Sequence, residues 1–193
     1  MSPAGCSAEI LDAISKVCDT VLDHSSPEFN SIDHVQELDR LERRLKYATQ
    51  YIEERKEPGS TRENEKAVQI AELYRLAGLT YLYRGAQRLP ATASKVKGVV
   101  RAGYALLARL ESCDRAFPVF ILGCEARFDK ERLQILDLIR RTQESGTFGN
   151  IIQVQQFVEA AWKQHDLDTE NELDYTTIME AVVSMSKELP CFV

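Results

Sequence analysis

One carboxylate in this 193-residue chain stands where acid–base chemistry is conceivable. Glu125 directly follows the apolar run Phe120–Cys124. Burying a carboxylate costs on the order of several kcal/mol of free energy unless the group is paired. In one interpretation its pKa is raised and it serves as a general acid or base. In the other it forms a structural ion pair that pins two helices, with one of four arginines as its partner: Arg75, Arg84, Arg127 or Arg132.

Three further side chains are hydrogen-bond donors placed among apolar neighbours, namely Tyr81, Arg84 and Tyr104. A shaped pocket with one or two donors that polarise a carbonyl group can accelerate a cyclisation or a pericyclic reaction. Such a reaction needs neither a nucleophile nor a metal. These three residues are therefore the candidate catalytic donors, with Glu125 as the candidate acid or base.

Aromatic and soft side chains are the other feature that points to a ligand. Buried tyrosine and tryptophan seek a hydrogen-bond partner, methionine adapts to irregular apolar shapes, and ligand cavities are lined by such residues. The sequence predicts a mostly apolar cavity between a central helix and the C-terminal helices. Its predicted lining is Tyr74, Tyr81, Phe117, Phe120, Cys124, Phe157, Trp162, Met179 and Met185. The simpler interpretation is that most of these side chains only fill the core.

Metal and cofactor motifs are missing from the sequence. None of the five cysteines forms a Cys-x-x-Cys pair, so a zinc cluster cannot be assembled from them. His24, His34 and His165 stand near expected helix ends, without the spacing of metal ligands. Phosphate loops, dinucleotide-binding motifs and the Gly-x-Ser-x-Gly motif are absent as well. We therefore expect no metal and no cofactor.

The charge balance bears on the partners. The chain has 24 basic and 30 acidic residues, a net charge of −6, whereas proteins that bind nucleic acid directly are usually basic. The longest apolar run, Ala116–Cys124, is far shorter than the roughly 20 residues that a membrane helix needs. The N-terminus lacks the features of a secretory signal. We expect an intracellular protein, cytoplasmic or nuclear, that neither binds nucleic acid itself nor spans a membrane.

Hydrophobic periodicity predicts an all-α fold, with one domain over residues 1–193 and seven to eight helices around a buried central helix. The second expected helix is amphipathic, and its stripe of Val35, Leu38, Leu41, Leu45, Ala48 and Ile52 is a candidate surface for homodimer formation. Asp129 is the expected cap of the sixth helix. The eight expected helices cover residues 7–22, 33–57, 67–82, 92–110, 117–126, 129–144, 150–164 and 175–185, with the third as the central one.

Several segments, taken in order, resemble the C-terminal effector domain of fungal zinc-cluster transcription factors. The resemblance covers nearly the whole chain, and although each motif is weakly specific, their order and spacing together are fairly specific. The matching residues are Gly5–Leu11, Ala71–Arg84 with Leu89-Pro90, Phe117–Ala126 with Glu131-Arg132, Gly149-Asn150, and Val158–Lys163 with Asp166.

The resemblance implies a helical bundle that, in the family, follows an N-terminal DNA-binding zinc cluster. It also implies a ligand site near the C-terminal helices, since some members sense sterol-like molecules. This chain departs from the pattern because the zinc cluster and the long middle region are absent. Phe117 stands where many relatives carry tryptophan, and the tail Pro190–Val193 has fewer aliphatic residues than usual.

Three functions remain open at this point. The first is a regulator-type domain that binds a hydrophobic small molecule such as a sterol, terpenoid or polyketide, without a DNA-binding module of its own. The second is a stand-alone enzyme of secondary metabolism, a cyclase or pericyclase that reuses the pocket. The third is a protein-interaction module.

Overall fold

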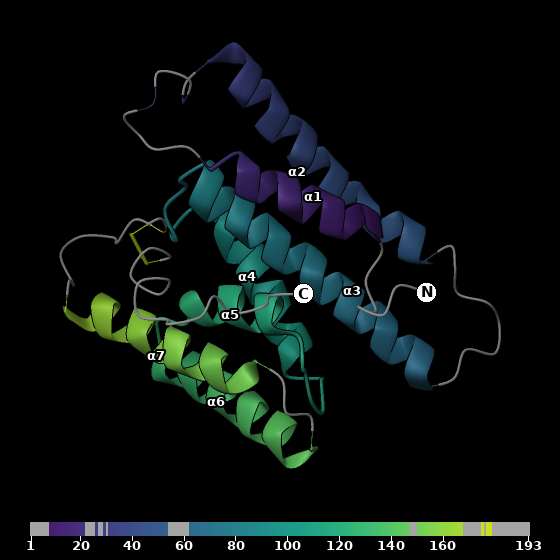
Figure 1. Ribbon diagram of the computed structural model, residues 1–193, viewed down its shortest axis with the longest axis vertical. Coiled ribbons are helices and arrows are strands. Elements are labelled where there is room, and N and C mark those ends of the chain that lie inside the picture. Colours follow the sequence, from purple (N-terminus) through teal and green to yellow (C-terminus); the bar gives the residue numbers. More distant parts are fainter. Residues whose placement is uncertain are drawn as a thin grey trace. The chain divides into compact units, whose positions relative to one another are not determined.

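The computed structural model describes residues 8–21, 26, 29, 31–53, 62–146, 150–167, 175 and 177–178. Every regular element in these segments is a helix and none is a strand, so the predicted all-α class is confirmed. Figure 1 labels the α-helices. The elements are α1 (Ala8–Asp19), α2 (Ile32–Glu53), α3 (Arg62–Tyr81), the π-helical turn η1 (Leu82–Ala86), α4 (Ser94–Leu107), α5 (Ala116–Cys124), α6 (Asp129–Glu144) and α7 (Ile151–Leu167).

The contacts within the chain gather into two compact units, Met1–Leu89 and Pro90–Val193. In the first unit, α2 packs against both α1 and α3. The leucine stripe of α2 lies in this interface, and Leu41 and Leu45 are fully buried. Four residues of the stripe expected to pair with a second copy, Leu38, Leu41, Leu45 and Ala48, are therefore part of the core of their own unit, where burial of each leucine contributes about 1.5–3 kcal/mol. Val35 is 48% exposed, and the side chain of Ile52 lies outside the described residues.

Helix α3 carries the most deeply buried residues of the first unit. From Ile70 to the end of the helix nearly every side chain is buried, because α1, α2 and η1 all pack against it. Close packing depends on Gly78, since a Cβ atom there would lie 2.9 Å from Cγ1 of Ile14. The expected buried central helix is therefore present as the core helix of this unit.

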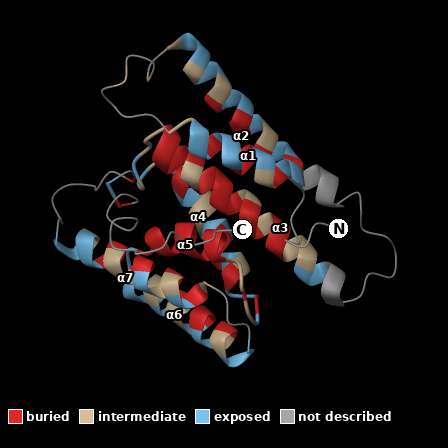
Figure 2. Cartoon of the chain, viewed as in Figure 1, coloured by how far each residue is buried: buried red, intermediate tan, exposed pale blue. Residues whose placement is uncertain are grey.

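Helix α5 has the same role in the second unit. All nine of its residues are buried, and α4, α6 and α7 each pack against it. Figure 2 draws it in the colour of buried residues along its whole length. Pro118 lies in its first turn, where the missing N–H of proline breaks no hydrogen bond. A short helix that is apolar on every face can be stable only when it is enclosed in this way.

Among the described residues, none of the helices is long and apolar enough to cross a membrane.

Candidate functional site

The C-terminal end of α5 is a point where side chains from several segments converge. The last carbonyl groups of any helix lack i+4 partners. Here the carbonyl groups of Leu122 and Gly123 accept backbone N–H groups of Glu125 and Ala126, and side chains add further donors. The indole Nε1 of Trp162 donates to the carbonyl oxygen of Gly123 over 2.8 Å, and the Tyr104 hydroxyl donates to that of Leu122 over 2.8 Å. The Tyr175 hydroxyl donates to the carbonyl oxygen of Ile121 over 3.4 Å.

Arg132 of α6 adds a fourth donor. Its Nε donates to the carbonyl oxygen of Ala126 over 3.4 Å, and its guanidinium carbon lies 5.5 Å from the ring centroid of Trp162. The same guanidinium forms two hydrogen bonds with the carboxylate of Asp166, at 2.9 and 2.6 Å, which lowers the pKa of that carboxyl. We refer to Tyr104, Arg132, Trp162 and Tyr175 together as the α5 donor cluster.

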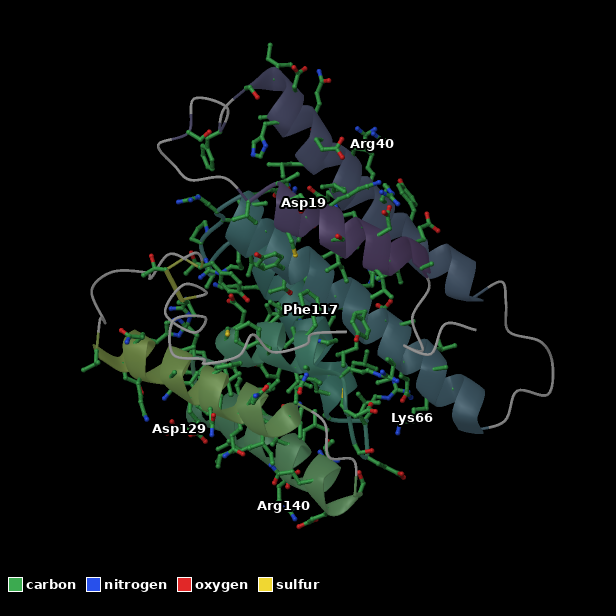
Figure 3. All side chains as sticks on the ribbon, in the orientation of Figure 1. Asp19, Arg40, Lys66, Phe117, Asp129 and Arg140 are labelled. Carbon is green, nitrogen blue, oxygen red and sulfur yellow. The ribbon has the colours of Figure 1, made fainter. Side chains whose placement is uncertain are left out.

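A group of buried apolar side chains adjoins this cluster. The rings of Phe120 on α5 and Phe157 on α7 meet edge to face with centroids 6.1 Å apart, and both are buried. Cys124 is buried as well, and burial, followed by the negative charge of Glu125, raises the pKa of its thiol well above the usual value. Phe117, labelled in Figure 3, belongs to the same helix. Five of the predicted ligand contacts, with Trp162 included, are therefore gathered on α5 and α7.

The candidate acid or base, Glu125, lies at this same end of α5. Only 5% of its surface is exposed, and its backbone N–H donates to the carbonyl oxygen of Leu122 over 3.1 Å. Burial, followed by the charges of Glu131 and Glu125, raises the pKa of Tyr104. Tyr104 therefore stays protonated at neutral pH, as a donor already engaged with a backbone carbonyl group.

The candidate residues Tyr74, Tyr81 and Arg84 belong to the first unit. Tyr74 is buried, whereas Tyr81 is partly exposed and its pKa is raised to about 12 by burial and then by the charge of Cys18. The buried Arg84 guanidinium donates to the carbonyl oxygen of Leu89 over 2.7 Å. The catalytic and ligand-binding roles expected of these residues stay predictions.

Sequence reasoning missed a buried polar cluster in the first unit, centred on Glu42. Its Oε1 accepts a hydrogen bond from Tyr83 over 3.1 Å and its Oε2 accepts one from Gln87 over 3.3 Å, while Lys46 pairs with the same carboxylate. Burial, followed by the charge of Glu42, raises the pKa of Tyr83. Helical spacing could have indicated that Glu42 is buried, because it lies four residues after Leu38 and shares the buried face of that residue.

Two of the expected contacts, Met179 and Met185, lie outside the described residues. Within the described segments, the structure contains no group of three or more histidine, cysteine or acidic side chains that could hold a metal ion. The second unit thus places buried apolar side chains beside neutral and cationic donors that bond to backbone carbonyl groups.

Comparison with known proteins gives a family match over nearly the whole chain. A family described as the fungal specific transcription factor domain matches residues 4–189. Transcription factor iacI of Pestalotiopsis fici is 29% identical over 184 residues, which are 95% of this chain and 46% of that protein. The chain thus spans about half the length of this curated relative. No solved structure matches.

Proposed function

Because the chain belongs to the fungal specific transcription factor domain family, we propose that it is a regulatory domain whose effector is a hydrophobic small molecule. The observation that carries this proposal is the α5 donor cluster. Donors from α4, α7 and the segment at Tyr175 bond to carbonyl groups of one short apolar helix, and Arg132 of α6 bonds to that of Ala126 just beyond it. A molecule bound beside α5 would shift this helix relative to all four of these segments at once. This coupling supports a role in signal transmission.

The chemistry of the neighbouring side chains favours an apolar ligand. Phe117, Phe120 and Phe157 offer ring faces and edges, and Trp162 has its polar atom engaged with Gly123. A site lined by such side chains suits a sterol, terpenoid or polyketide-like molecule, because most of the surface of such a molecule is apolar and forms few hydrogen bonds. Glu125 is the group that we expect to meet a polar end of the ligand.

The proposal assigns DNA recognition to residues other than those of this chain, since its cysteines lack the spacing of a zinc cluster. It also implies that the domain acts in the nucleus. The family and the description of the relative as a transcription factor support the nuclear role.

Native mass spectrometry of the chain purified from a fungal host tests the proposal. We expect a bound hydrophobic compound that is released on denaturation, and at least ~10-fold less of it on the Phe157→Ala variant, because a buried aromatic ring contributes much of the binding free energy. The matched control is Phe128→Ala, since the Phe128 side chain is 72% exposed. A compound converted on the protein would instead indicate the cyclase or pericyclase, and an empty wild-type protein would refute ligand binding.

A further inference from the structure

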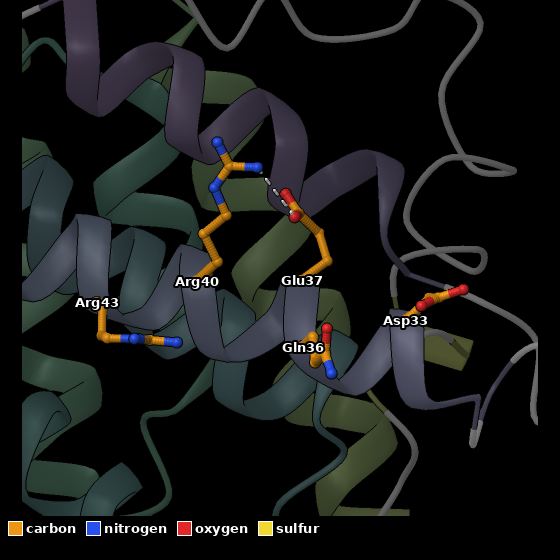
Figure 4. Close-up of a pocket in the computed structure, with 5 residues that line it drawn as sticks. All are labelled: Asp33, Gln36, Glu37, Arg40 and Arg43. Carbon is orange, nitrogen blue, oxygen red and sulfur yellow. Dashed lines mark ion pairs between the residues drawn. The ribbon is translucent and has the colours of Figure 1, made fainter.

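The outer face of α2, opposite its leucine stripe, is a charged surface that the proposed ligand site does not use. An open hollow of about 520 Å³ lies along this face and is lined by Asp33, Gln36, Glu37, Arg40 and Arg43 (Figure 4). The Arg40 side chain is 71% exposed. This face is thus free to meet another surface.

The charges on this face are ordered along the helix. The acidic pair Asp33 and Glu37 lies in the N-terminal part of the hollow, and the basic pair Arg40 and Arg43 lies in the C-terminal part. Two such faces are complementary when the helices run antiparallel, and repel each other when they run parallel. We propose that the outer face of α2 binds the same face of a second copy of this chain, in antiparallel orientation about a two-fold axis.

The helical register supports this pairing. Placing the two-fold axis between positions 38 and 39 brings Glu37 of each copy level with Arg40 of the other and Asp33 within one residue of Arg43, because each helical residue rises 1.5 Å. The same axis brings Ile32 within two residues, about 3 Å, of the level of Tyr47. These two side chains are 76% and 63% exposed, so the pairing also covers apolar surface at both ends.

The ion pair now present within the face does not oppose the association. Arg40 and Glu37 are 3.6 Å apart and both are exposed, and such pairs contribute little to stability. Each can exchange its partner within the chain for one on the second copy. Arg44 stays engaged with Asp12 over 2.9 Å, and Lys46 stays engaged with Glu42.

The balance of charges explains why a second copy fits better than another partner. The lining of the hollow has two acidic and two basic side chains, so it has no net charge to attract nucleic acid or an anionic membrane. Its charge order repeats with opposite sign when read backwards, as an isologous interface requires.

The test is sedimentation equilibrium of the full chain with two complementary double variants. In Arg40→Glu/Arg43→Glu the face becomes entirely acidic, and in Asp33→Lys/Glu37→Lys it becomes entirely basic. We expect wild-type chain to form dimers that weaken as salt is raised, and each variant alone to dimerise at least ~10-fold more weakly. Mixing the two variants should restore dimers, because an acidic face then meets a basic one.

Restoration by mixing separates the proposal from a folding defect, since a misfolded variant would not regain its partner. A control pair of charge changes on α6, Arg140→Glu and Asp137→Lys, alters exposed side chains of the second unit and should leave dimer formation unchanged. A wild-type chain that stays monomeric at all concentrations would overturn the proposal. So would variants that dimerise as the wild type does, or a mixture that remains monomeric.

Discussion

The indole of Trp162 on α7 reaches the backbone of Gly123 on α5, with Nε1 donating to the carbonyl oxygen over 2.8 Å. The approach is close because residue 123 has no side chain. A Cβ atom at that position would lie 2.5 Å from Cγ1 of Val158 on α7. The two helices are therefore held by a hydrogen bond and by steric fit at the same place.

Loss of this hydrogen bond should weaken the second unit. In Trp162→Phe the carbonyl group of Gly123 loses its side-chain donor while it remains buried, so we expect the free energy of unfolding to fall by about 1–2 kcal/mol. Urea denaturation followed by circular dichroism measures the change. Phe128→Leu, at an exposed position, should stay within about 0.5 kcal/mol of wild type. Equal effects of the two changes would argue against a structural role of the hydrogen bond.

Steric fit at α5 gives a second prediction. Gly123→Ala should lower the free energy of unfolding by about 1–3 kcal/mol, because the new methyl group overlaps Val158. Gly98→Ala is the matched control, since that position lies within α4 with no atom within 4 Å of the new Cβ. It should raise stability by about 0.5–1 kcal/mol through helix propensity. Thermal unfolding compares the two, and a stable Gly123→Ala protein would contradict the packing described above.

Much of the fold could be predicted from the sequence, since apolar periodicity marks where each helix buries its side chains. The details at helix ends could not, because they depend on single polar contacts. Asp129 was expected to cap α6, but it is the first helical residue, and Phe128 occupies the cap position. The Glu131 carboxylate accepts hydrogen bonds from the backbone N–H groups of Arg127 and Phe128, at 2.9 and 3.2 Å, and so performs the capping.

The π-helical turn was also beyond prediction, since its residues Leu82–Ala86 continue the apolar pattern of α3. A backbone bond from Gln87 to Leu82 over 2.8 Å closes the turn, and Arg88 follows with a positive φ of 50°. At the candidate site, the identities of Tyr104 and Trp162 indicated buried donors. That both would be directed at α5 carbonyl groups follows from tertiary packing, which no local pattern specifies.

The Glu42 cluster yields a third prediction. Glu42→Ala removes the acceptor of Tyr83 and Gln87 inside the first unit, so stability should fall by about 2–3 kcal/mol. Glu42→Gln keeps one carbonyl acceptor and should recover part of the loss. The backbone N–H of Gln87 closes η1, and its hydrogen exchange should accelerate more in the alanine variant than in the glutamine variant. If the exchange there were unchanged, the cluster would not be what holds the turn.

Alkaline pH gives a fourth prediction, through Tyr81. Its pKa is raised to about 12 in the folded chain, so the unfolded chain loses this proton first, near pH 10. The contribution of Tyr81 to stability is complete below pH 10 and is lost as the pH rises to about 12. In Tyr81→Phe the free energy of unfolding should therefore fall less steeply between pH 10 and pH 12. The difference in free energy of unfolding between the wild type and Tyr81→Phe at pH 8 is the baseline. If this difference stayed the same from pH 8 to pH 12, Tyr81 would not contribute to the pH dependence of stability.

Trp162 is the single tryptophan of the chain and belongs to the α5 donor cluster, so its fluorescence reports on the proposed ligand site directly. The decisive measurement is a titration of the purified chain with the compound released in native mass spectrometry, or with a sterol, a terpenoid and an aromatic polyketide in turn. We expect a saturable change in emission with one ligand class, with an affinity at least ~10-fold weaker in Phe157→Ala and unchanged in Phe128→Ala. Emission that stays constant with every class, or that responds equally in both variants, would contradict a ligand site at α5.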